Sequence, residues 1–213
     1  MRFLRRSLLL CGLIAPPLFV AFVFAATLAR RDYSSISIAL SHLGDIEAPH
    51  AWVFNTGIAL YGALVAIFAI GVYRKLGGGR RAVAVAAPLA LYGLANIAIG
   101  AFKVDVLEGG GGHGLEHATH IAAARAAYLL AIAAMVGAVY ALPSKNKLRW
   151  FSLAAAASMV VFGILFSSEQ ADSWNGVWQR GFIGTATAWV ETVAVSLYRA
   201  QQRGRLTDFK AGA

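Results

Sequence analysis

Charged residues and cysteine are scarce in this sequence. Charged side chains make up 14% of the 213 residues, whereas hydrophobic residues make up 59%. A soluble domain of this size needs a larger polar surface to cover its core. The single cysteine, Cys11, excludes both an intrachain disulfide and a metal cluster built on several cysteines. These deficits favour one membrane-embedded domain over residues 1–213.

Motifs for phosphate binding and for serine hydrolysis are also missing. The glycine runs at residues 77–79 and 109–112 lack the strand before and the helix after that a phosphate-binding loop requires. A serine, a histidine and an aspartate occur together between residues 35 and 45, but no nucleophile-elbow pattern accompanies them. Neither a nucleotide-binding loop nor a Ser-His-Asp hydrolase is therefore predicted.

Long apolar segments dominate what is present. A helix needs about 20 apolar residues to cross a bilayer, with a lower limit of about 17. Four segments exceed that length and two lie at its limit: residues 7–29, 51–72, 82–102, 119–142, 150–166 and 182–197. The sequence therefore predicts an all-α, polytopic membrane protein with six transmembrane helices in a bundle.

Basic residues are divided unequally between the segments that connect these spans. With a cytoplasmic N-terminus, the inner segments contain 14 basic residues and the outer ones four, Arg30, Arg31, Lys103 and Arg180. The inner set is Arg2, Arg5, Arg6, Arg74, Lys75, Arg80, Arg81, Lys145, Lys147, Arg149, Arg199, Arg203, Arg205 and Lys210. Basic residues concentrate on the cytoplasmic side of membrane proteins, so both termini are predicted to lie in the cytoplasm. The protein itself is predicted to lie in the cell membrane. The net charge of +9 then reflects topology, so membrane lipid is an expected partner and nucleic acid is not.

The strongest chemical pattern lies at the outer end of the fourth span. His113, His117 and His120 follow a helical i, i+4, i+7 spacing and share one face. Two imidazoles one turn apart can hold one metal ion, and Asp105 supplies an oxygen ligand from the preceding loop. Zinc or another divalent metal with an open position would activate water. Asp105, His113 and His117 are thus the candidate catalytic residues, and His120 is a further metal ligand.

Two other interpretations of these histidines stay open. One is the start of an interfacial helix whose polar residues face water or lipid headgroups. The other is proton transfer without a metal. The first outer connection is open in the same way, because its serines and His42 also suit a short amphipathic helix at the interface.

Further polar residues are predicted to line the same outer pocket. Arg125 and Glu191 fall inside spans, where ionisable side chains are costly and commonly functional, although structural pairing is an alternative. Arg125 is expected to reach outward toward the acidic loops, and Glu191 to be buried. The full set of predicted pocket residues is Ser41, His42, Asn55, Asn96, Arg125, Arg180 and Glu191.

Four short motifs, in their order along the chain, resemble the family named domain of unknown function 998. They are residues 41–44 (SHLG), residues 101–105 (AFKVD), His113 and Gly114 with His117, and residues 176–180 (GVWQR). The sequence departs from the family pattern at His42, where an acidic residue is expected, and at Lys103, where proline is common. The resemblance implies a multi-pass membrane fold and no particular activity.

The paired histidines are also similar to a motif of the ceramidase and progestin-receptor superfamily of zinc amidases. That superfamily combines an HxxxH pair on a late span with a Ser-x-x-x-His motif on an early one. Here Ile38 stands four residues before His42, so the early motif is not matched. This likeness is an analogy of site rather than of sequence.

These observations support two functions of different classes. The first is a membrane-embedded hydrolase, with or without a metal, that acts on a lipid-like substrate at the extracytoplasmic face. The alternative is a non-enzymatic binder or transporter of an apolar ligand, with Glu191 and Arg125 as coupling charges. A haem protein ranks third, because all five histidines fall on the predicted outer side.

The charge distribution gives a direct test of orientation. A cytoplasm-dependent reporter fused after Ala213 should be active, because positive charge keeps the connecting segments inside. A periplasm-dependent reporter at the same site should be silent. Activity of the periplasmic reporter alone would reverse the topology and place the histidines inside the cell.

Overall fold

The computed structural model describes residues 2–105, 114–168 and 173–202. Within these residues every secondary-structure element is a helix, apart from one isolated β-bridge. The prediction of an all-α fold is confirmed. The elements in chain order are α1 (Arg2–Ala29), the 3-10 helix η1 (Leu40–Gly44), α2 (Ala51–Lys75), α3 (Gly79–Ala101), α4 (Leu115–Ala141), α5 (Lys147–Phe166) and α6 (Asn175–Gln202).

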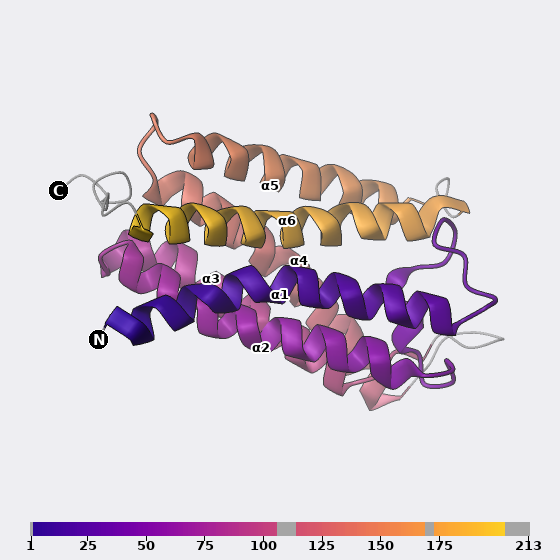
Figure 1. The fold of residues 1–213 in the computed structure, drawn as a ribbon. Helices are drawn as coiled ribbons and strands as arrows, with labels where there is room; N and C mark the ends of the chain where they lie inside the picture. The colour runs from indigo at the N-terminus through magenta and orange to yellow at the C-terminus, as the bar shows by residue number, and fades with distance from the viewer. Residues whose placement is uncertain (1, 106–113, 169–172, 203–213) are drawn as a thin grey trace.

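Each long helix packs against the next one in the chain, and α6 returns to pack against α1. The six helices therefore follow one another around the bundle, with α1 and α6 side by side (Figure 1). The start of α1 and the end of α6 lie at the same end of the bundle (Figure 1). This arrangement is the one expected of six antiparallel crossings.

Five of the helices, α1 to α5, are long and apolar enough to cross a membrane. The sixth, α6, has 28 residues and a length of about 42 Å at about 1.5 Å per residue. It is less apolar because it carries Arg180 and Glu191. It also begins at Asn175 rather than at the predicted Phe182, so Arg180 lies in the helix and not in an outer loop. The first two turns of α6 contain polar residues, so a search for long apolar segments places the start of this helix too late.

The outer surface of the bundle is as apolar as its interior. Phe24 and Leu129 are 65% and 63% exposed, whereas Tyr61, Phe68 and Trp189 are buried. Large exposed apolar surfaces of this kind mark contact with lipid or another protein. The buried indole of Trp189 donates to Ser152 Oγ at 2.9 Å, which satisfies its only polar atom.

A close contact between two helices joins α2 to α3 through a pair of glycines. A Cβ added to Gly93 would lie 2.5 Å from the carbonyl oxygen of Gly62 and 2.6 Å from the amide nitrogen of Ala66. A Cβ added to Gly62 would meet the carbonyl oxygen of Gly93 equally closely. Small residues at such positions allow membrane helices to approach backbone to backbone.

This contact predicts opposite effects for two glycine-to-alanine substitutions. Gly93→Ala should destabilise the protein by about 1–3 kcal/mol, because the added methyl overpacks the α2–α3 contact. Gly184→Ala is the control, since no atom lies within 4 Å of its Cβ position. It should gain about 0.5–1 kcal/mol from better helix propensity. Thermal unfolding in detergent measures both, and equal stability of the two variants would contradict the packing argument.

Candidate functional site

The connection after α1 folds back on itself through Tyr33. The phenol of Tyr33 donates to the carbonyl oxygens of Ile38 and Ala39, each at 3.1 Å. Burial raises the pKa of Tyr33, and the positive charges of Arg180 and Arg30 oppose that rise. The side chain therefore stays a neutral donor and holds the chain that leads into η1.

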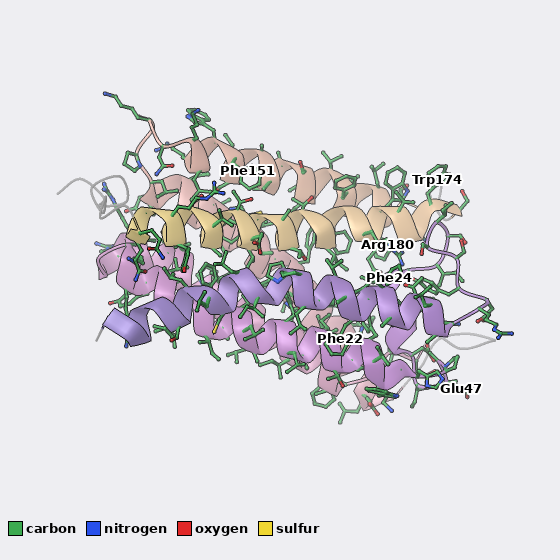
Figure 2. All side chains as sticks on the ribbon, viewed as in Figure 1. Phe22, Phe24, Glu47, Phe151, Trp174 and Arg180 are labelled. Atoms are coloured by element: carbon green, nitrogen blue, oxygen red, sulfur yellow. The ribbon has the colours of Figure 1, made fainter. Side chains whose placement is uncertain are left out.

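Arg180 fastens this connection to α6. Its Nη1 donates to the carbonyl oxygens of Ser35 at 2.9 Å, Gly176 at 3.1 Å and Ile38 at 3.5 Å. Its Nη2 donates to the hydroxyl of Tyr33 at 2.7 Å, and the guanidinium lies 5.4 Å from the centre of the Tyr33 ring. Figure 2 shows Arg180 between α6 and α1, near the end where the connection leaves α1. A guanidinium suits this position because it offers five donors in a fixed plane.

Neighbouring residues of α6 complete the attachment. A Cβ on Gly176 would lie 2.5 Å from two carbonyl oxygens of the connection, so only glycine allows this approach. The amide of Val177 donates to the carbonyl oxygen of Ile36 at 3.1 Å. Gln179 accepts from the amide of Ser41 at 3.2 Å and donates to its hydroxyl at 3.4 Å. The motif at residues 176–180 thus binds the first connection through main-chain groups.

The other end of η1 is attached to α2 and to the segment after α3. Asn55 donates from Nδ2 to the carbonyl oxygen of Gly44 at 3.2 Å. The amide of Ile46 donates to the carbonyl oxygen of Val104 at 3.0 Å, and Asp45 and Val104 form a parallel bridge. The motifs at residues 41–44 and 101–105 therefore meet side by side at this end of the bundle.

The structure places His117 and His120 beside the segment that follows α3 and gives each imidazole a main-chain partner. The amide of Asp105 donates to Nδ1 of His117 at 3.1 Å. Nδ1 of His120 lies 2.7 Å from the carbonyl oxygen of Phe102, and His120 is only 2% exposed. Both imidazoles thereby hold the end of α3 against the start of α4. His113 lies outside the described residues.

These hydrogen bonds bear on the metal prediction. An imidazole that accepts at Nδ1 carries its proton on Nε2 when neutral, so His117 has no free lone pair in this arrangement. Within residues 2–105, 114–168 and 173–202, no three His, Cys, Asp or Glu side chains are grouped to hold a metal ion. The metal site with His113 stays a prediction.

The remaining predicted polar residues lie apart from one another. Arg125 is exposed and forms no ion pair with a described carboxylate. Asn96 is buried in α3, where its Nδ2 donates to the carbonyl oxygen of Tyr92 at 2.8 Å. The phenols of Tyr92 and Tyr61 are 3.2 Å apart, and Tyr61 also hydrogen-bonds the side chain of Thr187 on α6. The predicted single pocket is thus divided between a cluster at the end of α3 and the start of α4, an interior polar layer and α6.

A groove of about 500 Å³ lies between α1 and α6. We call it the α1–α6 groove. Its walls are mainly apolar, and its lining residues are Pro16, Pro17, Phe19, Val20, Val23, Leu40, Arg180, Ile183, Gly184, Thr187, Ala188 and Glu191. On α6 these residues follow a helical stripe, so one face of the helix forms one wall.

Two ionisable residues mark the length of this groove. Arg180 lies at the end next to the connection, and Glu191 lies about three turns further along α6, at about 16 Å. Glu191 Oε2 is buried and has no hydrogen-bond partner among the described residues. Between the two charges, the Cβ position of Gly184 has no atom within 4 Å. The groove is therefore open at its centre and polar at both ends.

The sequence does not identify Tyr33, Gln179 or Gly184 as site residues. It also does not predict that Pro16 and Pro17 line a groove. A signal for α6 was present, because Arg180, Gly184 and Ala188 follow an i, i+4, i+8 spacing with two small residues. This spacing has no structural meaning in a helix that begins after Arg180, as the sequence predicts, and gains it only because α6 begins at Asn175. Tyr33 gave no such signal, since its partners are main-chain carbonyls.

Comparison with known proteins places these features in a family. Residues 13–196 match the model of the family described as protein of unknown function (DUF998). The chain belongs to the DUF998 family. The matched residues include both walls of the α1–α6 groove and the motifs that attach the first connection. No curated protein and no solved structure matches the chain.

The environment of His42 in this DUF998 protein favours the neutral form of its imidazole. Burial lowers the pKa of His42, the carboxylate of Asp45 partly opposes this shift, and the charge of Arg30 adds to it. The folded state therefore prefers the neutral imidazole, whereas the unfolded chain accepts a proton near its usual pKa of about 6.5. Stability from this group is present above that pH and is lost as the pH falls.

Acidification should destabilise the wild type more than a variant that cannot be protonated at this position. The comparison is His42→Gln against wild type, with thermal unfolding recorded at about pH 8 and about pH 5, on either side of the usual histidine pKa. The fall in midpoint on acidification should be smaller for His42→Gln. The other four histidines are common to both proteins and cancel in this comparison. An identical fall would show that His42 does not contribute.

Proposed function

We propose that this DUF998 protein binds the hydrocarbon chain of a single-chain, lipid-like amphiphile in the α1–α6 groove. The observation that carries the proposal is an open, mainly apolar groove with an ionisable side chain at each end. Its volume of about 500 Å³ lies within the range of about 300–1,000 Å³ that is typical of small-molecule sites.

The polar ends matter more here than the apolar walls. In water, burial of each CH₂ group is worth about 0.8 kcal/mol. A chain that enters from a bilayer is already in an apolar solvent, so it gains mainly from packing against the walls. Selection of one amphiphile over bulk lipid therefore depends on its polar group and on Arg180 and Glu191.

The binder is favoured over the hydrolase by the position of the candidate catalytic residues. Asp105 and His117 belong to the α3–α4 connection, whereas the groove is lined by α1, α6 and Leu40. None of the lining residues comes from α3 or α4. Nδ1 of His117 also accepts a hydrogen bond from a main-chain amide. A water activated at that cluster would act outside the groove.

A bulky residue at Gly184 should block chain binding without disturbing the fold. Gly184→Phe places a ring in the open centre of the groove, where no atom lies within 4 Å of the Cβ position. Labelling of the purified protein by a long-chain alcohol with a photoactivatable group in its chain should fall about tenfold, equivalent to about 1.4 kcal/mol. Mass spectrometry of the wild type should locate the label on peptides of α1 and α6.

Ala87→Phe is the matched control. Ala87 is exposed on α3, away from the groove, so this variant adds the same ring to another lipid-facing surface. Its labelling should equal that of the wild type. Equal labelling of the two variants would overturn the binding proposal. A stoichiometric divalent metal that is lost in His117→Ala, together with cleavage of a lipid, would favour the hydrolase instead.

A further inference from the structure

The inner end of the α1–α6 groove combines a carboxyl group with an interruption of helical hydrogen bonding. Glu191 stands on the α6 wall, and Pro16 and Pro17 stand on the α1 wall. Proline has no N–H, so the carbonyl oxygens of Gly12 and Leu13 do not receive the i+4 hydrogen bond that a helix normally supplies. These two carbonyls lie one turn before the prolines that line the α1 wall, and the carboxyl group of Glu191 lies on the α6 wall.

These oxygens lie at the same depth in the bundle. Leu13 is 11 residues from the start of α1 at Arg2, and Glu191 is 11 residues from the end of α6 at Gln202. The start of α1 and the end of α6 lie at the same end of the bundle (Figure 1). At about 1.5 Å per residue, both positions are about 16 Å from that end. The carboxyl group and the two carbonyls therefore share one level of the α1–α6 contact.

Such a set of acceptors favours a cation with N–H donors. An ionised carboxylate without a partner costs about 2.5–3.5 kcal/mol at the centre of a membrane helix. A primary ammonium neutralises that charge and offers three N–H donors, one for the carboxylate and two for carbonyl oxygens. In membrane transporters, helices interrupted near the midplane bind cations through unpaired carbonyls in the same way.

We propose that the amphiphile bound in the α1–α6 groove is a long-chain primary amine, with its ammonium group at Glu191 and its chain directed toward Arg180. This inference rests on the proposed function and names its ligand class. The positive charge of Arg180 at the opposite end repels the ammonium and so fixes the direction of the ligand.

Arg180 is a poor site for the opposite ligand, a fatty acid. Nη1 and Nη2 of Arg180 already donate to oxygens of the first connection, at 2.7 Å to Tyr33 and 2.9 Å to Ser35. A carboxylate head group would have to displace these bonds and release the connection. Glu191 Oε2, in contrast, has no described partner to lose.

The test compares three probes with the same chain and different head groups: dodecylamine, dodecanol and dodecanoate. Each competes with the photoactivatable alcohol for the purified full-length protein in detergent. Wild type should bind dodecylamine at least about tenfold more tightly than dodecanol, because a charge-assisted hydrogen bond exceeds a neutral one. Glu191→Gln keeps the shape of the side chain and removes its charge. It should bind dodecanol as the wild type does and lose the preference for the amine.

A second variant keeps the inference testable if Glu191→Gln does not fold. Pro16→Ala combined with Pro17→Ala restores two N–H donors in α1 and leaves Glu191 intact. The preference for dodecylamine over dodecanol should shrink in this variant. Equal binding of amine and alcohol by wild type, or a preference for dodecanoate, would overturn the inference. Neither result affects the chain-binding proposal, which fails only if Gly184→Phe labels as well as Ala87→Phe.

Discussion

The end of the bundle at which α1 finishes and α6 begins depends on the hydrogen bonds of the Arg180 guanidinium. The connection after α1 presents the carbonyl oxygens of Ser35 and Ile38 to the start of α6, and main-chain groups left without a partner are costly. The Arg180 side chain of α6 donates hydrogen bonds to both carbonyl oxygens and to the hydroxyl of Tyr33. Because this bond joins the segment after α1 to the first turns of α6, it sets where the two helices meet. The mouth of the α1–α6 groove follows from that attachment.

The motifs that identify the DUF998 family in this chain are mainly architectural. Gln179 and Gly176 receive the first connection, Asn55 receives its end at Gly44, and His117 receives the segment after α3. In each case the partner is a main-chain group. The histidines that suggested a metal therefore have a physical role without one, as ties between loop backbone and helix ends. The groove proposed for ligand binding is lined by α1, α6 and Leu40, and Arg180 is the one lining residue that it shares with these motifs.

The fold could be predicted from the sequence because length and apolar composition are sufficient to define membrane helices. Five helices start and end close to the predicted limits, and α6 is the exception, since its first two turns are polar. The site was harder to predict, for a reason that His117 and Arg180 share. Side-chain spacing indicates which residues share a face, but it does not indicate that a main-chain amide or carbonyl occupies them. The α1–α6 groove was also out of reach, because it depends on contact between the first and last helices.

The two kinds of glycine in this bundle have different evolutionary consequences. At Gly62 and Gly93 any larger residue forces two helices apart, so these positions cannot change without a change elsewhere. At Gly184 the space is free, and the neighbouring groove residue Ala188 is exposed. Substitution there alters the shape of the groove and leaves the α2–α3 contact untouched. The shape of the groove along α6 can therefore change while the α2–α3 packing stays the same.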